Sequence, residues 1–387
     1  MNGNDTKCTS KSKRTRFLES GAVLLSLVGF LPFGLICFLT FLYHLTSAVQ
    51  YVVYGTFNVV IGSEEFQKMS AQHTGIYYAV VICVLLTYMI YWKNDYGAEI
   101  RGGHPIRSIR RFGAWKYVAD YFPIRLVLSD ELEEYIKAQS SSSTSNPEGT
   151  ADYSLSNKHN YLVGCHPHGV FSLGAFLNFM TDATGFSEKF PKLKPYLSIL
   201  GIHFKSPVYR DAMMFLGAVS SSKESLSYLL DPSRCKTTGN FVTVVLGGSR
   251  EVLEANPGSY RLHVKDRQGF FRLALKHGAP MIPCISFGET GMFKQIANPP
   301  GSTVRKIQDW WVSATTLPLY LFRGFNVIPR RIPVTTVVGA PIPCEEISNP
   351  TDEQIDEVKM RYLDSLKKLF FKYKPLYDPK SKDIEFV

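Results

Sequence analysis

Two histidines separated by one residue follow a short apolar run in the middle of the chain. Residues 161–165 have the composition of a buried strand, and His166-Pro167-His168-Gly169 comes directly after it. The ends of buried strands are where many α/β proteins place their ligands. Because the ordinary pKa of histidine lies near physiological pH, an imidazole can take a proton from a hydroxyl and return it. The pattern predicts a general base, either His166 or His168, with His168 favoured because Gly169 opens space beside it.

Two other interpretations of the pair are open. A close pair can arise by chance among nine histidines, and two imidazoles can also be metal ligands. A metal site needs further ligands, however, and the sequence has neither a Cys-x-x-Cys nor a His-x-x-x-His spacing to supply them. We therefore expect proton transfer without a metal or a cofactor.

Further sequence blocks accompany the histidine pair in a set order. They are Tyr121-Phe122-Pro123, Gly247-Gly248 with Glu251, Arg267-x-Gly269-Phe270 with Leu273-Ala274 and Gly278, Pro283 with Phe287-Gly288-Glu289, and Val337-Val338-Gly339-x-Pro341-Ile342. With the histidines, these blocks resemble the type 2 diacylglycerol acyltransferase family over roughly residues 76 to 373. The resemblance implies a membrane enzyme that transfers the acyl group of acyl-CoA, as a substrate, to diacylglycerol, monoacylglycerol or a long-chain alcohol.

The sequence departs from the pattern of this family at three places. Cys165 stands where an aromatic residue is more usual, Ser249-Arg250 replaces small residues before Glu251, and the linker before the histidine strand is longer. The first two changes lie at the expected site, so they bear on substrate choice more than on reaction type. Diacylglycerol is the expected acceptor, with monoacylglycerol and fatty alcohol as alternatives.

A glycine pair and a glutamate follow a second strand-like run. The main-chain N–H groups of Gly247 and Gly248, together with Gly169, can stabilise a developing oxyanion, although a tight turn needs glycine equally. Glu251 can hold a histidine in one tautomer, as the acid of a catalytic triad does, or it can be a solvated residue at the start of a helix. Glu289 is a weaker candidate for the same role.

Two arginines are candidates for contacts with the phosphates of CoA. Arg267 lies near the start of a helix expected from Asp266 to Gly278, where the positive end of the helix dipole disfavours a cation. A residue placed against this preference is a functional candidate, and the resemblance supports Arg267 more than Arg250. Ordinary surface arginines are the alternative interpretation of both.

We expect direct transfer, in which the deprotonated acceptor hydroxyl attacks the thioester of acyl-CoA. A thiolate at Cys165, beside an imidazole, offers a rival route through an acyl-enzyme. The direct route is favoured because the family places an aromatic residue at this position. A lipid-binding protein without catalysis would leave the histidines unexplained, and a lipid hydrolase would be favoured by a Gly-x-Ser-x-Gly motif, which the sequence lacks.

Residues 1–92 have the character of a basic tail followed by a membrane hairpin. Residues 21–42 carry only Ser and Thr as polar side chains and are long enough to cross a hydrocarbon core of about 30 Å. Residues 76–92 form a second apolar stretch bounded by aromatic residues. A secretory signal competes for the first stretch but lacks a convincing cleavage site. Because basic residues precede the first stretch and follow the second, both termini and residues 93–387 are expected in the cytosol.

Charge and cysteine content indicate the surroundings of the protein. The net charge is +10, and basic residues flank the expected spans and lie around Arg250 and Arg267, which favours anionic lipid headgroups and CoA phosphates over nucleic acid as partners. Seven cysteines are scattered singly, as expected in a reducing compartment. We expect the endoplasmic reticulum membrane, with a lipid-droplet location and a homo-oligomer as open alternatives.

The part after the hairpin has an α/β pattern. Apolar runs at residues 161–164, 241–246, 281–287 and 333–338 alternate with helical patterns, which predicts strands covered on both faces. Thr351 and Gln354 form a capping box before a long C-terminal helix. Residues 140–156 are rich in serine and are expected to be a flexible linker. The predicted fold is a membrane hairpin followed by a mixed α/β domain.

Overall fold

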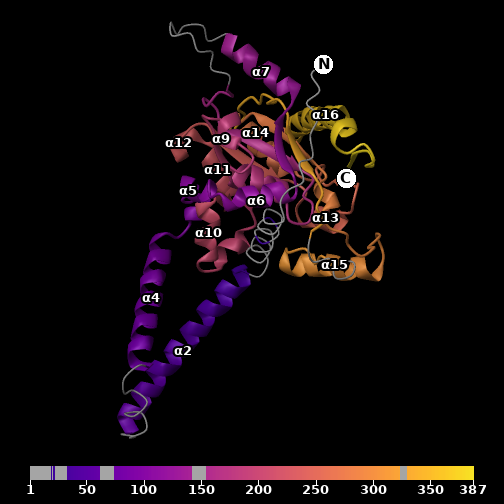
Figure 1. Cartoon of the computed structure of the whole chain (residues 1–387). Helices are drawn as coiled ribbons and strands as arrows, with labels where there is room; N and C mark the ends of the chain where they lie inside the picture. Colours follow the sequence, from indigo (N-terminus) through magenta and orange to yellow (C-terminus); the bar gives the residue numbers. More distant parts are fainter. Residues whose placement is uncertain (1–18, 20, 22–32, 62–73, 142–153, 323–328) are drawn as a thin grey trace.

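A seven-stranded sheet lies at the centre of the domain (Figure 1). The computed structural model describes residues 19, 21, 33–61, 74–141, 154–322 and 329–387. The order of the strands is β1-β8-β7-β2-β5-β3-β4, and all neighbours are parallel except β7 and β8. The strands are β1 (Ile124–Leu128), β2 (Tyr161–His166), β3 (Lys194–Ile199), β4 (Ala218–Ser220), β5 (Asn240–Val245), β7 (Met281–Phe287) and β8 (Val334–Val338), with β6 (Arg261–Leu262) and β9 (Glu385–Phe386) paired separately.

The four predicted strands are all present. They correspond to β2, β5, β7 and β8, and every residue of β2, β7 and β8 is buried. Helices cover both faces of the sheet, which is why these strands are apolar without alternation. The predicted α/β fold is confirmed.

Short helices and turns connect the strands. After the hairpin these elements are η1 (Ala98–Ile100), α5 (Arg107–Arg110), α6 (Ala114–Tyr121), α7 (Asp130–Ser141), α8 (Leu173–Ala175), η2 (Phe176–Met180), α9 (Phe186–Lys189), η3 (Gly201–Lys205), α10 (Tyr209–Phe215), α11 (Lys223–Leu230), α12 (Pro232–Cys235), α13 (Gly248–Glu254), α14 (Gln268–Lys276), η4 (Glu289–Gly291), α15 (Thr303–Thr315) and α16 (Asp352–Tyr377). The capping box of α16 is present, since Thr351 accepts from the N–H of Gln354 and the Gln354 side chain accepts from the N–H of Thr351. Of the predicted linker, residues 142–153 lie outside the described residues.

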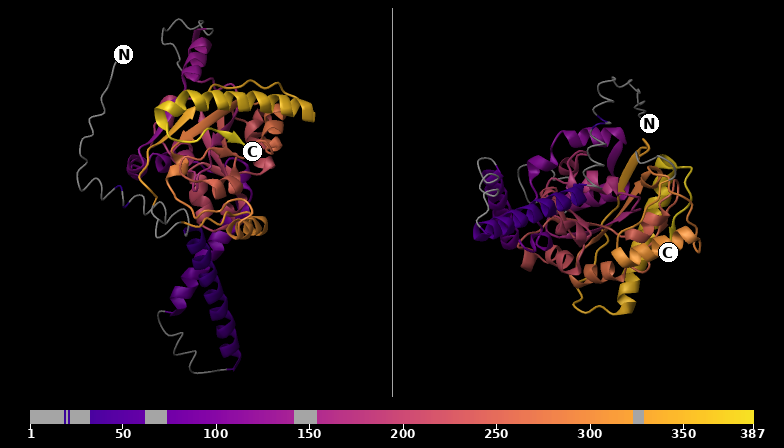
Figure 2. Two further views of the ribbon diagram at one scale, coloured as in Figure 1. Left: turned by 90° about the vertical axis from the view of Figure 1, so that its right-hand side faces the viewer. Right: turned by 90° about the horizontal axis from the view of Figure 1, so that it is seen from below.

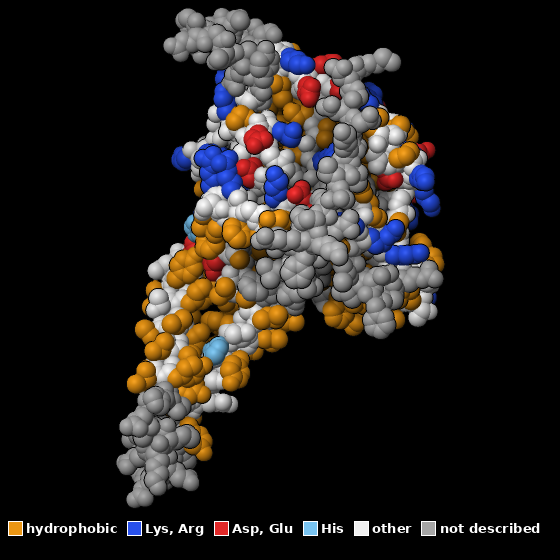
Figure 3. All heavy atoms as spheres, viewed as in Figure 1, with side chains coloured by type: hydrophobic (Ala, Val, Ile, Leu, Met, Phe, Trp, Pro, Cys, Tyr) orange, Lys and Arg blue, Asp and Glu red, His pale blue; other side chains and the backbone are white. Residues whose placement is uncertain are grey.

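Two long apolar helices project together from one side of the domain (Figures 1 and 2). They are α2 (Phe33–Ile61) and α4 (Thr74–Asn94), and each has the length and composition to cross a membrane. Hydrophobic side chains dominate the hairpin surface in Figure 3. The second helix matches the predicted span. The first continues to Ile61 instead of ending at Leu42, because apolar residues such as Val49 and Val53 extend the helix beyond the polar His44; residues 22–32 lie outside the described part.

The hairpin is held to the domain through α10 and the residues just before it. The main-chain oxygen of Gly34 accepts from the Ser206 hydroxyl, and Tyr88 donates to the Asp211 carboxylate at 2.7 Å. Asp211 in turn pairs with Arg210, a fully buried guanidinium that also contacts Asp95 at the end of the hairpin. These contacts fix the direction in which the hairpin leaves the domain.

Candidate active site

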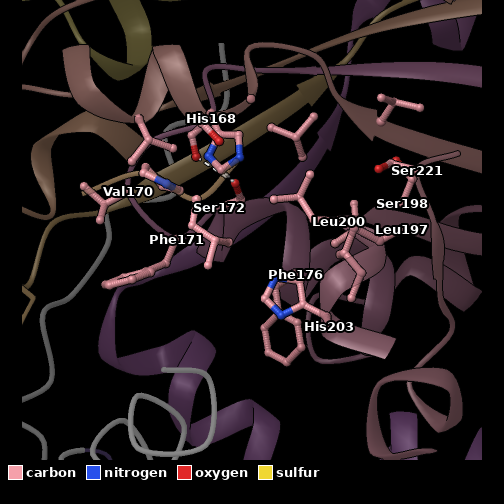
Figure 4. Close-up of a pocket in the computed structure, with 18 of the residues that line it drawn as sticks. His168, Val170, Phe171, Ser172, Phe176, Leu197, Ser198, Leu200, His203 and Ser221 are labelled. Carbon is pink, nitrogen blue, oxygen red and sulfur yellow. Dashed lines mark hydrogen bonds between the residues drawn. The ribbon is translucent and has the colours of Figure 1, made fainter. Parts of the chain in front are cut away.

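His168 lies in the loop after β2 with one ring nitrogen tied to the protein (Figure 4). Nδ1 is 3.0 Å from the Ser172 hydroxyl and 3.3 Å from the Gly169 carbonyl oxygen. Because a carbonyl only accepts, Nδ1 carries the proton. The Ser172 hydroxyl accepts from Nδ1 while it donates to the His168 carbonyl at 2.8 Å. This leaves Nε2 with a free lone pair, as a general base requires.

The ring of His168 is held in its basic form. Burial, with a smaller contribution from the nearby positive charge of Arg267, lowers the pKa of this imidazole to about 4. The side chain is partly exposed where it borders a cavity. At neutral pH the ring is therefore uncharged and able to accept a proton.

His166 points away from this cavity and into the core beneath α16. Its Nε2 lies 3.0 Å from the Tyr362 hydroxyl, which itself donates to the Gly164 carbonyl at 3.2 Å. A Cβ on Gly164 would come within 2.0 Å of that hydroxyl, so glycine is needed for this contact. Nδ1 has no partner, and burial lowers the pKa of His166 to about 3. The structure therefore separates the two imidazoles and places only His168 beside open space.

Glu251 lies close to His168 but does not bond to its imidazole. Oε2 accepts from the main-chain N–H of His168 at 3.3 Å, and Oε1 is buried without a partner. A Cβ on Gly247 would lie 1.3 Å from Oε2, which shows that the carboxyl folds back over this glycine. Burial raises the pKa of Glu251 to about 8. The predicted contact with the imidazole is absent from this structure, because Ser172 already occupies Nδ1.

Glu289 holds the chain on the other side of the histidine loop. Its two carboxyl oxygens each accept from a main-chain N–H, of Leu173 and Gly174, at 2.9 Å. A Cβ on Gly169, whose φ is +62°, would lie 2.6 Å from Cγ of Glu289. Burial raises the pKa of this carboxyl to about 7. Glu289 thus supports the backbone after His168, and its carboxyl oxygens bond to main-chain N–H groups rather than to either imidazole.

The glycine pair lies at the turn between β5 and α13, and a hydrogen bond from Arg267 stabilises this turn. Nη2 of Arg267 donates to the Gly247 carbonyl at 2.7 Å from its position as the N-cap residue of α14. Gly248 has a φ of +60° and lines the cavity beside His168. Arg250 is exposed and borders neither this cavity nor the neighbouring groove. The structure therefore brings Arg267 to the site and leaves Arg250 outside it.

Two connected hollows meet at this turn. One is a chamber of about 260 Å³ with mainly apolar walls, which include Phe176, Met180 and Tyr209 beside His168. The other is a groove of about 800 Å³. Four basic residues line the groove, and Asp266 is the acidic residue in its lining. The basic residues are Lys223, Arg267, Arg272 and Lys276. The chamber and the groove share Leu200, Ser221, Val244, Val245 and Gly248.

Cys165 is poorly suited to a thiolate mechanism. The thiol is fully buried within β2, and burial raises its pKa to about 12. It faces the Ser286 hydroxyl at 3.9 Å and does not line the chamber. A neutral, enclosed thiol is a weak nucleophile.

Comparisons with known proteins identify the family of the chain. The family model for diacylglycerol acyltransferase matches residues 148–387. The chain is 38% identical to 2-acylglycerol O-acyltransferase 1 of Bos taurus over 76% of its own length and 82% of that protein. It is 36% identical to human acyl-CoA wax alcohol acyltransferase 2 (77% and 83%) and 33% identical to human diacylglycerol O-acyltransferase 2 (75% and 70%). The chain belongs to the diacylglycerol acyltransferase family.

Membership of this family makes the protein an acyltransferase, with acyl-CoA and a lipid acceptor as the implied substrates. Two residues beside the histidines of this acyltransferase were not predicted from sequence. Tyr362 lies four residues after Val358 on the buried face of α16, so helical periodicity indicates its burial but not its contact with His166. Ser172 follows His168 by four residues in irregular backbone with a φ of +51°, and no sequence motif predicts its contact with the imidazole. Tyr362 meets its histidine through a tertiary contact, and Ser172 meets His168 through the local course of the loop.

Proposed function

We propose that this acyltransferase esterifies the free hydroxyl of diacylglycerol with the acyl group of acyl-CoA and thereby makes triacylglycerol. The observation that carries the proposal is the position of His168. Its free Nε2 belongs to a residue that lines an apolar chamber, and this chamber joins a basic groove at Gly248. An apolar chamber suits lipid chains, and a basic groove suits the phosphates of CoA.

The proposed reaction is a direct transfer. Nε2 of His168 takes the proton of the acceptor hydroxyl while the hydroxyl oxygen attacks the carbonyl carbon of the thioester. The main-chain N–H groups of Gly169, Gly247 and Gly248 are the proposed donors to the tetrahedral oxyanion. When the intermediate collapses, the carbon–sulfur bond breaks and the imidazolium returns its proton to the CoA thiolate. The atoms balance without a metal or a cofactor, so a chelator should leave the rate unchanged.

Arg267 is the proposed phosphate contact in the groove. Only one of its terminal nitrogens is used by Gly247, so the guanidinium can bond to the turn and to an anion at once. Arg272 and Lys276 lie one and two turns further along α14 and line the same groove. Arg272 already forms an ion pair with Asp352 at 2.9 Å. Of these two basic residues, Lys276 is therefore the more available to a phosphate.

Monoacylglycerol is the second candidate acceptor. It is favoured by the 36–39% identity to the mammalian 2-acylglycerol O-acyltransferase 1 proteins, which compares with 33% for human diacylglycerol O-acyltransferase 2. A long-chain alcohol is the third, from the 36% identity to the wax alcohol enzyme. A common chamber for lipid chains is compatible with all three.

The proposed location is the endoplasmic reticulum membrane, where residues 1–92 form the anchor and residues 93–387 the cytosolic catalytic domain. The two exposed apolar helices and the basic residues that flank them support this arrangement. A lipid-droplet location and self-association are compatible with the same hairpin.

Purified full-length protein in phospholipid vesicles provides the test. Radiolabelled oleoyl-CoA is supplied with diacylglycerol, monoacylglycerol or hexadecanol, and the products are separated. We expect label in triacylglycerol, and its loss in His168→Ala. Label in diacylglycerol alone would replace the acceptor with monoacylglycerol, label in wax ester alone would replace it with an alcohol, and equal product from the wild type and His168→Ala would overturn the mechanism.

A further inference from the structure

Helix α15 (Thr303–Thr315) turns an apolar face to the outside of the domain. Ile307, Trp310 and Trp311 are exposed by 52%, 66% and 38%. Residues spaced by three and four positions share one side of a helix, so these three side chains form a continuous strip. We call this strip the tryptophan face. Large exposed apolar surfaces of this kind mark interaction sites.

The opposite side of α15 is polar and is fixed to the protein. Gln308 is buried; its side-chain oxygen accepts from Asn298 at 2.8 Å, and its amide donates to the Leu319 carbonyl at 2.8 Å. Arg305 pairs with Glu254 at 3.1 Å. Most helices of a water-soluble domain bury their large apolar side chains, whereas α15 buries Gln308 and leaves the tryptophan face exposed. Its anchored polar side prevents the tryptophan face from rotating inward.

The position of α15 identifies what covers this face. In Figures 1 and 2 the helix lies on the side of the domain from which α2 and α4 project, and it runs across that side. Hydrophobic side chains follow the same edge of the domain in Figure 3. A bilayer entered by the hairpin would therefore have its surface at the level of α15. Tryptophan is enriched at this depth, and the exposed Lys306 beside the face suits anionic headgroups.

The segment after α15 connects the tryptophan face to the chamber. Leu317, Pro318 and Tyr320 line the chamber, and the Thr316 carbonyl accepts from the Ser249 hydroxyl at 2.6 Å. A helix that rests on the bilayer would thus bring one wall of the chamber to the lipid surface. An acceptor with long chains could then enter without crossing water.

We propose that α15 is a third membrane contact, which lies flat in the headgroup layer of the membrane that the hairpin enters. This inference rests on the proposed role of the hairpin as a membrane anchor. The occupant of the tryptophan face is a lipid surface rather than a protein. The contact orients the chamber toward the bilayer and so supports the supply of the lipid acceptor.

Quenching of tryptophan fluorescence by lipids tests the contact directly. The chain has four tryptophans, of which Trp92 belongs to α4 and Trp115 packs on Phe176 inside the domain. In full-length Trp92→Phe protein, phosphatidylcholine brominated on its acyl chains should quench the emission strongly. The matched control adds Trp310→Phe and Trp311→Phe, which keep the apolar face but remove the reporters, and most of the quenching should disappear. Equal quenching in the two proteins would overturn the proposal.

The kinetic constants and the particle mass in detergent provide a second test of the contact. Trp310→Ala with Trp311→Ala should raise the apparent KM for an acceptor carried in vesicles several-fold, while the KM for acyl-CoA and the kcat stay near those of Ser313→Ala, an exposed control on the same helix. If the face joins two copies instead, the alanine variant would halve the particle mass in detergent and no quenching would be seen, which would refute the lipid contact. Quenching does not depend on turnover, so it remains informative if the proposed reaction fails.

Discussion

The two histidines of the motif have different surroundings. His166 ends β2 and bonds to Tyr362 in the core, whereas His168 lies in the loop and borders the chamber. A strand sends successive side chains to opposite faces, but the loop after it follows no such rule. The two imidazoles thus differ in exposure because the turn after β2 directs His168 to the chamber, whereas His166 packs against Tyr362.

Substitution of His168 should separate the base mechanism from the thiol mechanism. His168→Ala should lower kcat by at least ~10²-fold, because proton transfer by a positioned base contributes about this much. Cys165→Ser should retain much of the activity, since the buried thiol has no access to the chamber. Steady-state rates at matched protein levels in membranes provide the measurement. An inactive Cys165→Ser variant with label trapped on the wild-type protein would support the acyl-enzyme route instead.

Glu251 should act as a hydrogen-bond acceptor rather than as a charge. Its carboxyl meets the main-chain N–H of His168, and a pKa of about 8 keeps it protonated at neutral pH. Glu251→Gln should therefore keep most of kcat, whereas Glu251→Ala should lose activity because the His168 loop is no longer held. A triad-like acid would behave differently, since the amide would then be nearly as damaging as alanine.

The raised pKa of Glu251 should make the stability of the protein depend on pH. A carboxyl whose pKa is raised by folding binds more protons when folded, so stability falls as pH rises from about 4.5 to about 8. Glutamine does not titrate. The melting temperature of Glu251→Gln minus that of the wild type should therefore increase across this interval and level off above it. A constant difference from pH 5 to pH 8 would show that the carboxyl ionises freely in the folded protein.

Elements with a continuous apolar sequence or a clear cap could be predicted from the sequence. Strands β2, β5, β7 and β8 are covered on both faces, and the start of α16 is marked by Thr351 with Gln354. The end of α2 could not be placed, because its exposed residues beyond His44 vary between apolar and weakly polar types. The bond between Arg267 and Gly247 also escaped prediction, since it joins two loops that only the sheet brings together.

The N-terminal end of α14 should control the affinity for acyl-CoA. Arg267→Ala should raise the apparent KM for acyl-CoA more than the KM for the acceptor, because a hydrogen bond to a charged phosphate contributes about 1.5 to 3 kcal/mol, or roughly ten-fold and above. Arg250→Ala is the matched control, because Arg250 is exposed and lines neither hollow. Equal changes in both KM values for Arg267→Ala would remove this residue from phosphate binding.

At the scale of the whole molecule, the chamber lies between the loop that carries His168 and the end of the hairpin that joins the domain. Tyr209 lines the chamber, and its ring also packs against Gly34 of α2. Arg210 and Asp211, the next two residues, connect to α4 and to Asp95. One short helix, α10, therefore contacts both the lipid chamber and the membrane segment, which is the arrangement expected of an enzyme whose substrate arrives from the bilayer.

The lengths of the two hairpin helices allow both to cross the membrane, and the basic residues that flank them predict the orientation. At about 1.5 Å per residue, the 29 residues of α2 and the 21 residues of α4 extend over about 43 Å and 31 Å, and both exceed the hydrocarbon core of about 30 Å. Tags at residues 1 and 387 should react with an impermeant reagent when only the plasma membrane is opened. A glycosylation acceptor inserted between α2 and α4 should be modified in the lumen, while the natural Asn4-Asp5-Thr6 acceptor stays unmodified on the cytosolic side. Protection of either terminal tag, or glycan on Asn4, would exclude the proposed orientation.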